Sequence, residues 1–502
     1  MNDVTRSVGD GAAQLGSPTF GARKTSSPAF EIRGIIEGFY GVPWTHEQRL
    51  DMVRFIAARG MNTFVYAPKD DWFVRKGWRE QYTGSELDNL GELIDVCREL
   101  GVELVYCLSP GLSIRYSSET DLDRLVTKFE SVASLGVSFF GLLLDDIPEQ
   151  LQHEQDLAEF SDLVEAQQRL ISGVFDRLIG TGDDRRLVVC PTQYFGYGDE
   201  RYISRLGSSI DERIELFWTG RLICSPTLDL PDAEVFARST GRQPLYWDNY
   251  PVNDVAMTHE LHIGPYRGRD PLLHTGARGI IANGMEFVES SKIAFATIAD
   301  YLWSPADYDP EASWNQALGD VVGNGDVAGE ADVAAFRLFA DNVRSSCLSL
   351  DDAPMLTAAL ERFAFLNEIG RASEASEVIA ALAERFSTAA DHLLDGPVAN
   401  RALIDEARPW IESFRTGAEA LGVLARLAAE GRLEADATLE LREFRDRLVG
   451  ARRRVFGDAL DMTLAELVDP IARKPTTATP THPVPPHEVP LHRVPTHKEA
   501  AQ

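Results

Sequence analysis

Positive charge is scarce in this sequence. Lys and Arg total 49 against 78 Asp and Glu, so the formal net charge at pH 7 is 49 − 78 = −29. Nucleic acids and anionic membranes bind proteins through clusters of positive charge, and this balance argues against both as partners. The acidic excess favours solubility but says little about the fold.

Cysteines and long apolar runs are also few. The five cysteines are far apart, odd in number and without a CxxC spacing, which is typical of a reducing compartment. No segment approaches the roughly 20 apolar residues that a membrane-spanning helix needs. The N-terminal stretch lacks the apolar core of a secretory signal. We therefore expect a cytoplasmic protein that does not contact a membrane.

Both ends of the sequence have compositions typical of disordered chain. Residues 1–29 are rich in Gly, Ser, Ala and Thr without a period. Residues 471–502 are rich in Pro, Thr and His, which favours an extended conformation. Four histidines recur in this tail at intervals of five residues: His482, His487, His492 and His497. A solvated tail without a ligand is the favoured interpretation, and a weak metal site is the alternative.

Strand-like and helix-like segments alternate from Glu31 to Leu302. Eight apolar runs of strand length occur at 31–39, 61–68, 102–110, 137–144, 186–192, 213–220, 244–249 and 278–284. Helical patterns lie between many of them, including a long one over residues 155–179. Eight such units predict an α/β fold, a (β/α)8 TIM barrel over residues 30–308. A doubly wound open sheet is the alternative, which the lack of a Gly-rich phosphate-binding motif after the first strand disfavours.

Residues 309–470 have a different pattern. Ala, Leu, Arg and Glu dominate, and apolar residues recur at spacings of three and four, as in Val333, Phe336 and Phe339. This periodicity predicts an α-helical bundle of four to six helices after the barrel.

The most informative stretch is Gly136–Pro148, GVSFFGLLLDDIP. Its apolar residues predict a strand buried on both faces, as in a parallel sheet covered by helices. The strand ends at two adjacent carboxylates, Asp145 and Asp146, where α/β enzymes keep their chemistry. Adjacent side chains of a regular strand point to opposite faces. Both acids can therefore reach one ligand only if the backbone leaves β geometry near Asp145.

Most of the other predicted strands also end in polar or aromatic residues: Glu37–Tyr40, Lys69–Asp71, Tyr194, Trp218–Thr219, Trp247–Asn249 and Asn283. The carboxyl ends of barrel strands meet at one mouth. Carboxylates, amides and aromatic rings together suit a sugar, because its hydroxyls need hydrogen bonds and its C–H face packs on aromatic rings.

Eight motifs occur in this order: GIIEGFYGVPWTHEQR, NTFVYAPKDD, LSPGL, LLLDDI, CPTQY, FWTG, WDNYPVND and LHIGPYRGR. The chain from about Ile32 to Tyr301 thereby resembles the family 84 glycoside hydrolases, which are O-GlcNAcases and bacterial β-N-acetylglucosaminidases, historically also labelled hyaluronidase-like. The resemblance implies a (β/α)8 barrel and a retaining exo-β-N-acetylglucosaminidase without a metal or other cofactor. It implies substrate-assisted catalysis, in which the acetamido oxygen of the sugar is the nucleophile and forms an oxazoline.

The same resemblance implies roles for individual residues. Asp145 matches the acid that orients the acetamide and takes up its N–H proton. Asp146 matches the general acid that protonates the leaving oxygen and then activates water. Tyr194 matches the phenol that hydrogen-bonds the oxazoline oxygen. The remaining matches bind the substrate: Cys190, Thr219 and Trp247 line the acetyl pocket, Asn249 lies near the acetamido group and leaving oxygen, and Gly38, Lys69, Asp254 and Asn283 bind sugar hydroxyls.

The expected partner is an N-acetylglucosaminylated protein or glycan. Three roles are open for the bundle: it forms one wall of a groove that admits polypeptide, it mediates a homodimer, or it only packs on the barrel, in which case small GlcNAc conjugates are the expected substrates. A catalytically silent GlcNAc-binding protein on the same barrel is the alternative function, and the retention of both acids argues against it. A metal-dependent hydrolase is a third hypothesis, but the barrel histidines His259, His262 and His274 form no recognisable ligand pattern.

Overall fold

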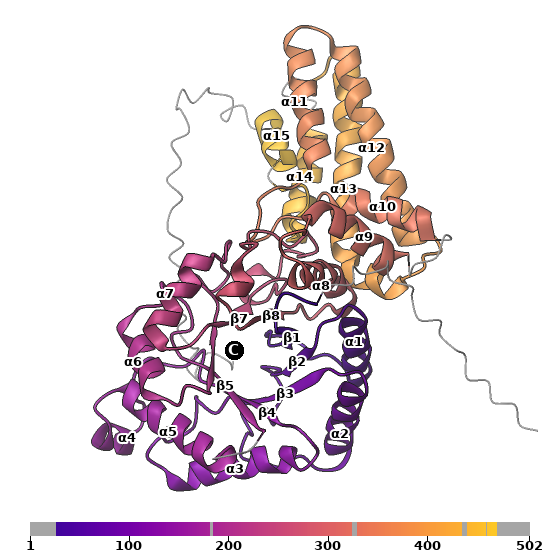
Figure 1. The fold of residues 1–502 in the computed structure, drawn as a ribbon. Coiled ribbons are helices and arrows are strands. Elements are labelled where there is room, and N and C mark those ends of the chain that lie inside the picture. Colours follow the sequence, from indigo (N-terminus) through magenta and orange to yellow (C-terminus); the bar gives the residue numbers. More distant parts are fainter. Residues whose placement is uncertain (1–26, 181–183, 324–328, 434–438, 458, 469–502) are drawn as a thin grey trace, which may run out of the picture.

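The computed structural model describes residues 27–180, 184–323, 329–433, 439–457 and 459–468 (Figure 1). The histidine repeat of the C-terminal tail and nearly all of the predicted disordered N-terminal segment lie outside these residues. Ala29, at the end of that segment, already contacts the barrel, because its N–H donates to the carbonyl of Trp303 at 3.0 Å.

Eight parallel strands close into a barrel (Figure 1). They are β1 (Ile32–Glu37), β2 (Thr63–Tyr66), β3 (Glu103–Leu108), β4 (Phe139–Leu143), β5 (Arg186–Cys190), β6 (Glu215–Trp218), β7 (Leu245–Asp248) and β8 (Gly279–Asn283). The first and last strands pair in parallel, with Ile32 opposite Gly279, and this pairing completes the ring. The predicted (β/α)8 barrel is thereby confirmed, and the open sheet is excluded.

Helices surround the strands. They are α1 (His46–Ala58), α2 (Gly84–Glu99), α3 (Glu119–Ala133), α4 (Glu154–Glu159), α5 (Leu163–Leu178), α6 (Arg201–Ser209), α7 (Leu230–Thr240) and α8 (Val288–Trp303). Thr45 and Gln48 form the capping box at the start of α1.

The prediction of one long helix over residues 155–179 is wrong. The chain leaves helical geometry at Phe160, and Asp162 begins α5 as an N-cap whose side chain accepts from the N–H of Glu165. The apolar period runs through this break, so periodicity alone did not reveal it.

Side chains from all eight strands fill the barrel interior. They form one buried cluster that includes Ile36, Val105 and Leu143, together with Cys190 and Trp247. A second and larger cluster lies between the strands and the surrounding helices. The strands are therefore apolar on both faces, as the run before Asp145 predicts.

Seven helices follow the barrel in the described part of the chain. They are α9 (Pro310–Val322), α10 (Glu330–Ala340), α11 (Pro354–Glu368), α12 (Ala372–Asp395), α13 (Arg401–Ala429), α14 (Leu439–Ala451) and α15 (Ala459–Val468). The helical region is confirmed, but the predicted number of four to six helices is too low. The last two helices, α14 and α15, are short and separate. Helices α11, α12 and α13 extend away from the barrel (Figure 1).

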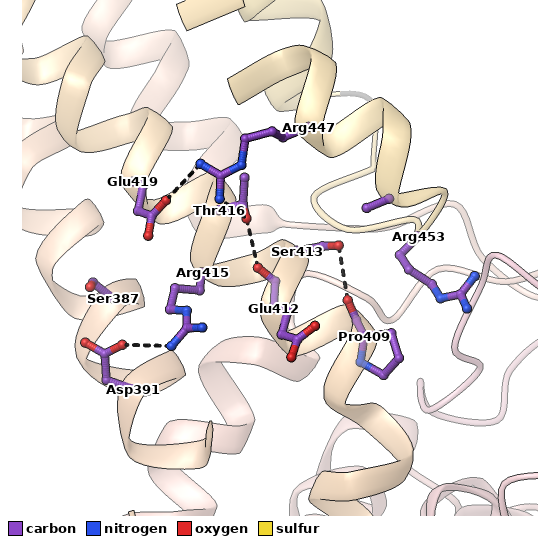
Figure 2. Close-up of a pocket in the computed structure, with 11 residues that line it drawn as sticks. Ser387, Asp391, Pro409, Glu412, Ser413, Arg415, Thr416, Glu419, Arg447 and Arg453 are labelled. Atoms are coloured by element: carbon purple, nitrogen blue, oxygen red, sulfur yellow. Dashed lines mark hydrogen bonds and ion pairs between the residues drawn. The ribbon is translucent and has the colours of Figure 1, made fainter. Parts of the chain in front are cut away.

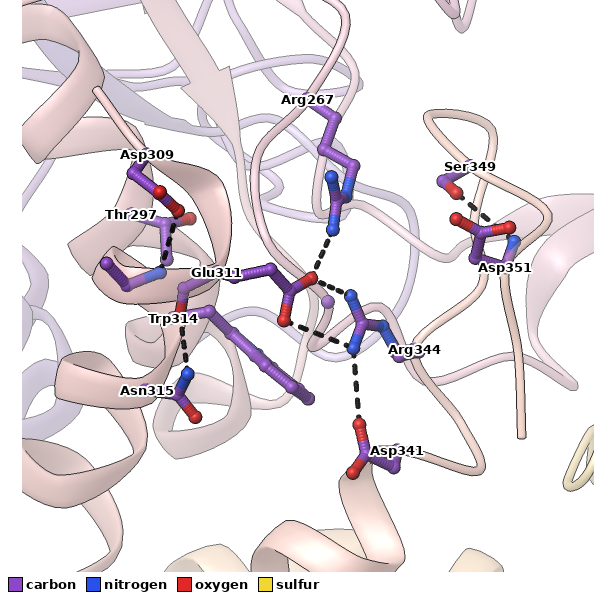
Figure 3. Close-up of polar contacts among 12 residues, drawn as sticks. Arg267, Thr297, Asp309, Glu311, Trp314, Asn315, Asp341, Arg344, Ser349 and Asp351 are labelled. Atoms are coloured by element: carbon purple, nitrogen blue, oxygen red, sulfur yellow. Dashed lines mark hydrogen bonds and ion pairs between the residues drawn. The ribbon is translucent and has the colours of Figure 1, made fainter. Parts of the chain in front are cut away.

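Ion pairs attach the helical region to the barrel (Figure 3). Glu311 of α9 accepts hydrogen bonds from Arg267 of the barrel and from Arg344 of the segment after α10. Arg344 also pairs with Asp341 at 3.2 Å and lies over the ring of Trp314. The two regions therefore share a partly buried polar contact beside an apolar one. Across the described residues, none of the helices is both long and apolar enough to cross a membrane.

Candidate active site

The two adjacent acids follow β4 directly. Asp146 has a φ of 53°, in the left-handed region, so the chain leaves β geometry between the two carboxylates. This turn allows both side chains to meet one common cation. Lys69 donates a hydrogen bond to Asp145 Oδ2, and its Nζ lies 3.4 Å from Asp146 Oδ2. The departure from strand geometry that two cooperating acids require is confirmed.

Asp145 is almost fully buried, and its two oxygens differ. Oδ2 accepts from Lys69, whereas Oδ1 is buried with no hydrogen-bond partner among the residues that the structure describes. Burial raises the pKa of Asp145, against the opposing charge of Lys69. A buried acceptor without a donor is costly, so Oδ1 is available to an N–H or O–H group of a ligand.

Asp146 receives two phenolic donors. The hydroxyl of Tyr40 donates to Oδ2 at 2.7 Å, and that of Tyr194 donates to Oδ1 at 3.1 Å. Arg75 Nη1 donates to the Tyr40 oxygen at 2.9 Å. Burial by itself would raise the pKa of Asp146, but Lys69, the Tyr40 hydrogen bond and Arg75 outweigh burial and lower it.

The pKa values of the two acids thus move apart, in the order opposite to the expected roles. The expected general acid, Asp146, is held in its charged form, and the expected acetamide acceptor, Asp145, binds a proton more readily. Asp145 is the more deeply buried of the two, and only Asp146 accepts from the phenols of Tyr40 and Tyr194, of which Tyr40 in turn accepts from Arg75.

Amide groups form a second network beside the acids. The N–H of Gly38 donates to Asn283 Oδ1 at 3.2 Å, and Asn283 Nδ2 donates to Asn249 Oδ1 at 3.0 Å. Trp247 Nε1 donates to the same Asn249 oxygen at 2.9 Å. The Nδ2 of Asn249 is bonded to the carbonyl of Ile223 at 2.8 Å. These bonds link the ends of β1, β7 and β8 and hold the side-chain amides of Asn249 and Asn283 in place.

The remaining predicted residues join these networks. Lys69 Nζ lies 5.5 Å from the centre of the Trp247 ring and so connects the acids to the amides. Thr219 donates its N–H to the carbonyl of Tyr194 at 2.9 Å. Asp254 accepts from the N–H of Tyr40 at 2.7 Å, and burial raises its pKa.

All eleven predicted site residues therefore lie in one region at the carboxyl ends of the strands. Cys190 belongs to the same buried cluster as Trp247, against which Tyr194 packs. Sequence reasoning missed Tyr40 and Arg75. Tyr40 had a signal, since it directly follows the first predicted strand, but Arg75 lies in a turn region after β2 and had none.

A cavity of about 770 Å³ lies elsewhere, between α12, α13 and α14 (Figure 2). Its lining mixes both charges, with Arg415 near Asp391 and Arg447 near Glu419. None of the eleven predicted residues lines it. Among the side chains that the structure describes, no group of three or more His, Cys, Asp and Glu is placed to hold a metal ion.

Comparison with known proteins gives one consistent family. A family model described as beta-N-acetylglucosaminidase matches residues 33–341. Mouse (Mus musculus) and rat (Rattus norvegicus) proteins named Protein O-GlcNAcase are each 32% identical over 299 residues, which is 58% of this chain and 31% of theirs. The chain thus spans about a third of the length of these curated relatives.

Two solved structures share most of the fold. An O-GlcNAc hydrolase of Thermobaculum terrenum, solved as an aspartate-to-asparagine mutant, is 34% identical with a TM-score of 0.82, over 88% of this chain and 95% of that one. The protein CpGH84B is 26% identical with a TM-score of 0.77, over 88% of this chain and 77% of that one. The chain belongs to the β-N-acetylglucosaminidase family, glycoside hydrolase family 84, as its ordered motifs predict.

Proposed function

We propose that the protein is a retaining exo-β-N-acetylglucosaminidase that removes terminal β-linked GlcNAc by substrate-assisted catalysis. The observation that carries the proposal is the unpaired, buried Oδ1 of Asp145 beside a second carboxylate, Asp146. An acetamido N–H supplies the donor that this oxygen lacks. The same contact turns the acetamido oxygen into the nucleophile, as the scheme requires.

The proposed reaction has two steps. In the first, the acetamido oxygen attacks the anomeric carbon, Asp145 accepts the N–H proton, and Asp146 protonates the leaving oxygen as the glycosidic bond breaks. In the second, Asp146 takes a proton from water, which attacks the anomeric carbon, and the oxazoline opens as Asp145 returns the proton to nitrogen. Tyr194 supports the oxazoline oxygen with its hydroxyl.

Substrate binding reverses the proton order of the free site. A donor to Asp145 Oδ1 favours the charged form of Asp145, because a hydrogen bond to a carboxylate stabilises its ionised state. A sugar that displaces the phenolic donors from Asp146 removes part of what lowers the pKa of that acid, beside the charges of Lys69 and Arg75. The substrate thereby assembles the protonation state that its own cleavage needs.

GlcNAc linked to Ser or Thr of a protein is the substrate we propose. The names of the mouse, rat and Thermobaculum terrenum relatives support this choice. A small GlcNAc conjugate is the alternative substrate. A silent GlcNAc-binding protein is not favoured, since Lys69, Asp145, Asp146 and Tyr194 form one connected set.

The test is hydrolysis of an aryl β-N-acetylglucosaminide, with a chelator present. Asp145→Asn and Asp146→Asn should each lose about 100-fold or more in kcat/KM, the usual contribution of a catalytic acid or base. With an activated leaving group, Asp146→Asn should lose less of the first step than Asp145→Asn, because that group departs without a proton. Asp351→Asn, at an exposed position in another Asp–Asp pair, is the matched control.

Three results would count against the proposal. A folded wild type that binds N-acetylglucosamine without turnover supports the silent binding protein instead. Equal activity of wild type and Asp145→Asn removes the acetamide role of Asp145. Loss of wild-type activity in the chelator restores the metal-dependent alternative.

A further inference from the structure

A chain of two hydrogen bonds ends on only one of the two acids. Arg75 Nη1 donates to the Tyr40 hydroxyl at 2.9 Å, and that hydroxyl donates to Asp146 Oδ2 at 2.7 Å. The guanidinium carbon of Arg75 also lies 5.3 Å from the centre of the Tyr40 ring, within the range of a cation–π contact.

The direction of this chain is fixed by its chemistry. A guanidinium group has donors and no acceptor, so the Tyr40 oxygen must accept from Arg75. A phenol has a single proton, which Tyr40 then directs at Asp146 Oδ2. Because the other carboxylate oxygen accepts from Tyr194, both oxygens of Asp146 are acceptors, and this arrangement suits its ionised form.

The backbone next to Arg75 is hydrogen-bonded to the end of β3. The carbonyl of its neighbour Val74 accepts from the N–H of Ser109, just after β3, at 2.9 Å, and Val74 is buried. Tyr40 is held from its other end, since its N–H donates to Asp254. The two side chains therefore present a preformed donor to Asp146.

Lys69 contacts both acids and lies nearer to Asp145, to which it donates, so it does not single out Asp146. The hydrogen-bond chain from Arg75 through Tyr40 ends on Asp146 alone. The charged and titratable groups around Asp146 are Lys69, Asp145, Cys190, Tyr194, Tyr40, Arg75 and, beyond Tyr40, Asp254.

We infer that Arg75, acting through Tyr40, is a positioning residue that governs when Asp146 carries the proton for the leaving group. The inference rests on the proposed function, in which Asp146 is the general acid. It adds a residue that acts through Tyr40, and the Tyr40 hydrogen bond is one of the causes that lower the pKa of Asp146 and not that of Asp145.

The first test is the pH dependence of kcat/KM, which reports the ionisation of groups in the free enzyme. A general acid must be protonated, so kcat/KM falls as the pH rises through its pKa. Arg75→Gln and Tyr40→Phe each remove support for charged Asp146, and the alkaline limb should move up by about half to one pH unit. Arg75→Lys, which keeps the charge, should shift it less. Lys76→Gln, an exposed neighbour of equal charge, is the control and should leave the limb in place.

A second test does not need turnover. It follows the proton on Asp146 through the infrared band of a protonated carboxyl. Subtracting the spectrum of the Asp146→Asn variant at each pH isolates the band of Asp146. In Arg75→Gln that band should persist to higher pH. Tyr40→Phe retains the aromatic ring and gives a second variant if Arg75→Gln does not fold.

A uniform loss of activity with an unmoved alkaline limb and an unmoved infrared titration overturns the inference and leaves Arg75 a structural residue. An inactive wild type overturns the proposed function instead, and the infrared titration then still decides whether Arg75 acts on Asp146.

Discussion

Lys69 and Asp145 form an ion pair in which the two side chains are only 3% and 5% exposed. The ammonium group of Lys69 also lies 3.4 Å from Oδ2 of a second acid, Asp146. One ammonium group thus contacts two carboxylates, of which that of Asp145 is buried and that of Asp146 is partly exposed. Burial by itself would lower the pKa of Lys69, but the two carboxylates outweigh it and hold the pKa of Lys69 above its usual value, so Lys69 is charged throughout the working pH range.

Lys69→Met should destabilise the protein and abolish most of its activity. Removing one partner of a buried ion pair leaves an uncompensated charge and costs about 3–5 kcal/mol. The free energy of unfolding, measured by urea denaturation at pH 7, checks the first part. Lys76→Met, at the exposed position seven residues along, should change it little. The double variant Lys69→Met/Asp145→Asn should recover part of the free energy of unfolding that Lys69→Met loses. If the effects of the two substitutions on that free energy simply add, the two side chains do not interact.

The barrel could be predicted from the sequence because its signals are local. Each strand is a short apolar run with polar residues at its carboxyl end, and the run before Asp145 is apolar at every position that faces the interior or the helices. The break between α4 and α5 could not be predicted, because it depends on Asp162 capping a helix inside a continuous helical pattern.

The sequence predicts residues that lie together in the structure, but it does not predict their electrostatics. Asp145 and Asp146 stand next to each other in sequence, and yet their pKa values move in opposite directions. Part of the difference comes from Tyr40, which donates to Asp146 and accepts from Arg75, and these two residues belong to two other loops of the barrel. No spacing in the sequence indicates that these loops meet at one oxygen of Asp146.

Gly38→Ala should impair substrate binding more than folding. A Cβ at this position would lie 2.7 Å from Trp247 Cζ2 and 3.2 Å from Asn283 Oδ1, so both side chains would have to move. A displacement of about 1 Å in a positioned site costs about 100-fold in rate, and kcat/KM for an aryl β-N-acetylglucosaminide measures it. Gly91→Ala is the control: it lies inside α2 with no atom within 4 Å of the added Cβ, and it should stabilise the protein by up to about 1 kcal/mol. Equal kcat/KM in Gly38→Ala and wild type would show that the pocket tolerates the methyl group.

Glu406 joins the helical region to the barrel through the first turn of α8. Its carboxylate accepts from the N–H groups of Glu289 and Ser290 at 3.0 and 2.8 Å, and from the Ser290 hydroxyl at 3.0 Å. Burial nevertheless raises its pKa to about 7, because these hydrogen bonds offset only part of the desolvation. About half of the Glu406 carboxyl groups are therefore charged near neutral pH in the folded protein. In the unfolded chain the pKa of Glu406 has its ordinary value of 4.5.

This difference predicts a pH dependence of stability. Between pH 4.5 and about 7 the folded protein binds more protons at Glu406 than the unfolded chain does. The stabilisation by this group is therefore complete below pH 4.5 and is lost as the pH rises through about 7. Glu406→Gln keeps an acceptor for the α8 N–H groups and removes the titration. Relative to that of wild type, its free energy of unfolding should rise by about 2–3 kcal/mol between pH 5 and pH 8. Glu377→Gln, at an exposed position of α12, should run parallel to wild type over that range. If Glu406→Gln also runs parallel, the α8 N-terminus stabilises the charged carboxylate enough to cancel its burial.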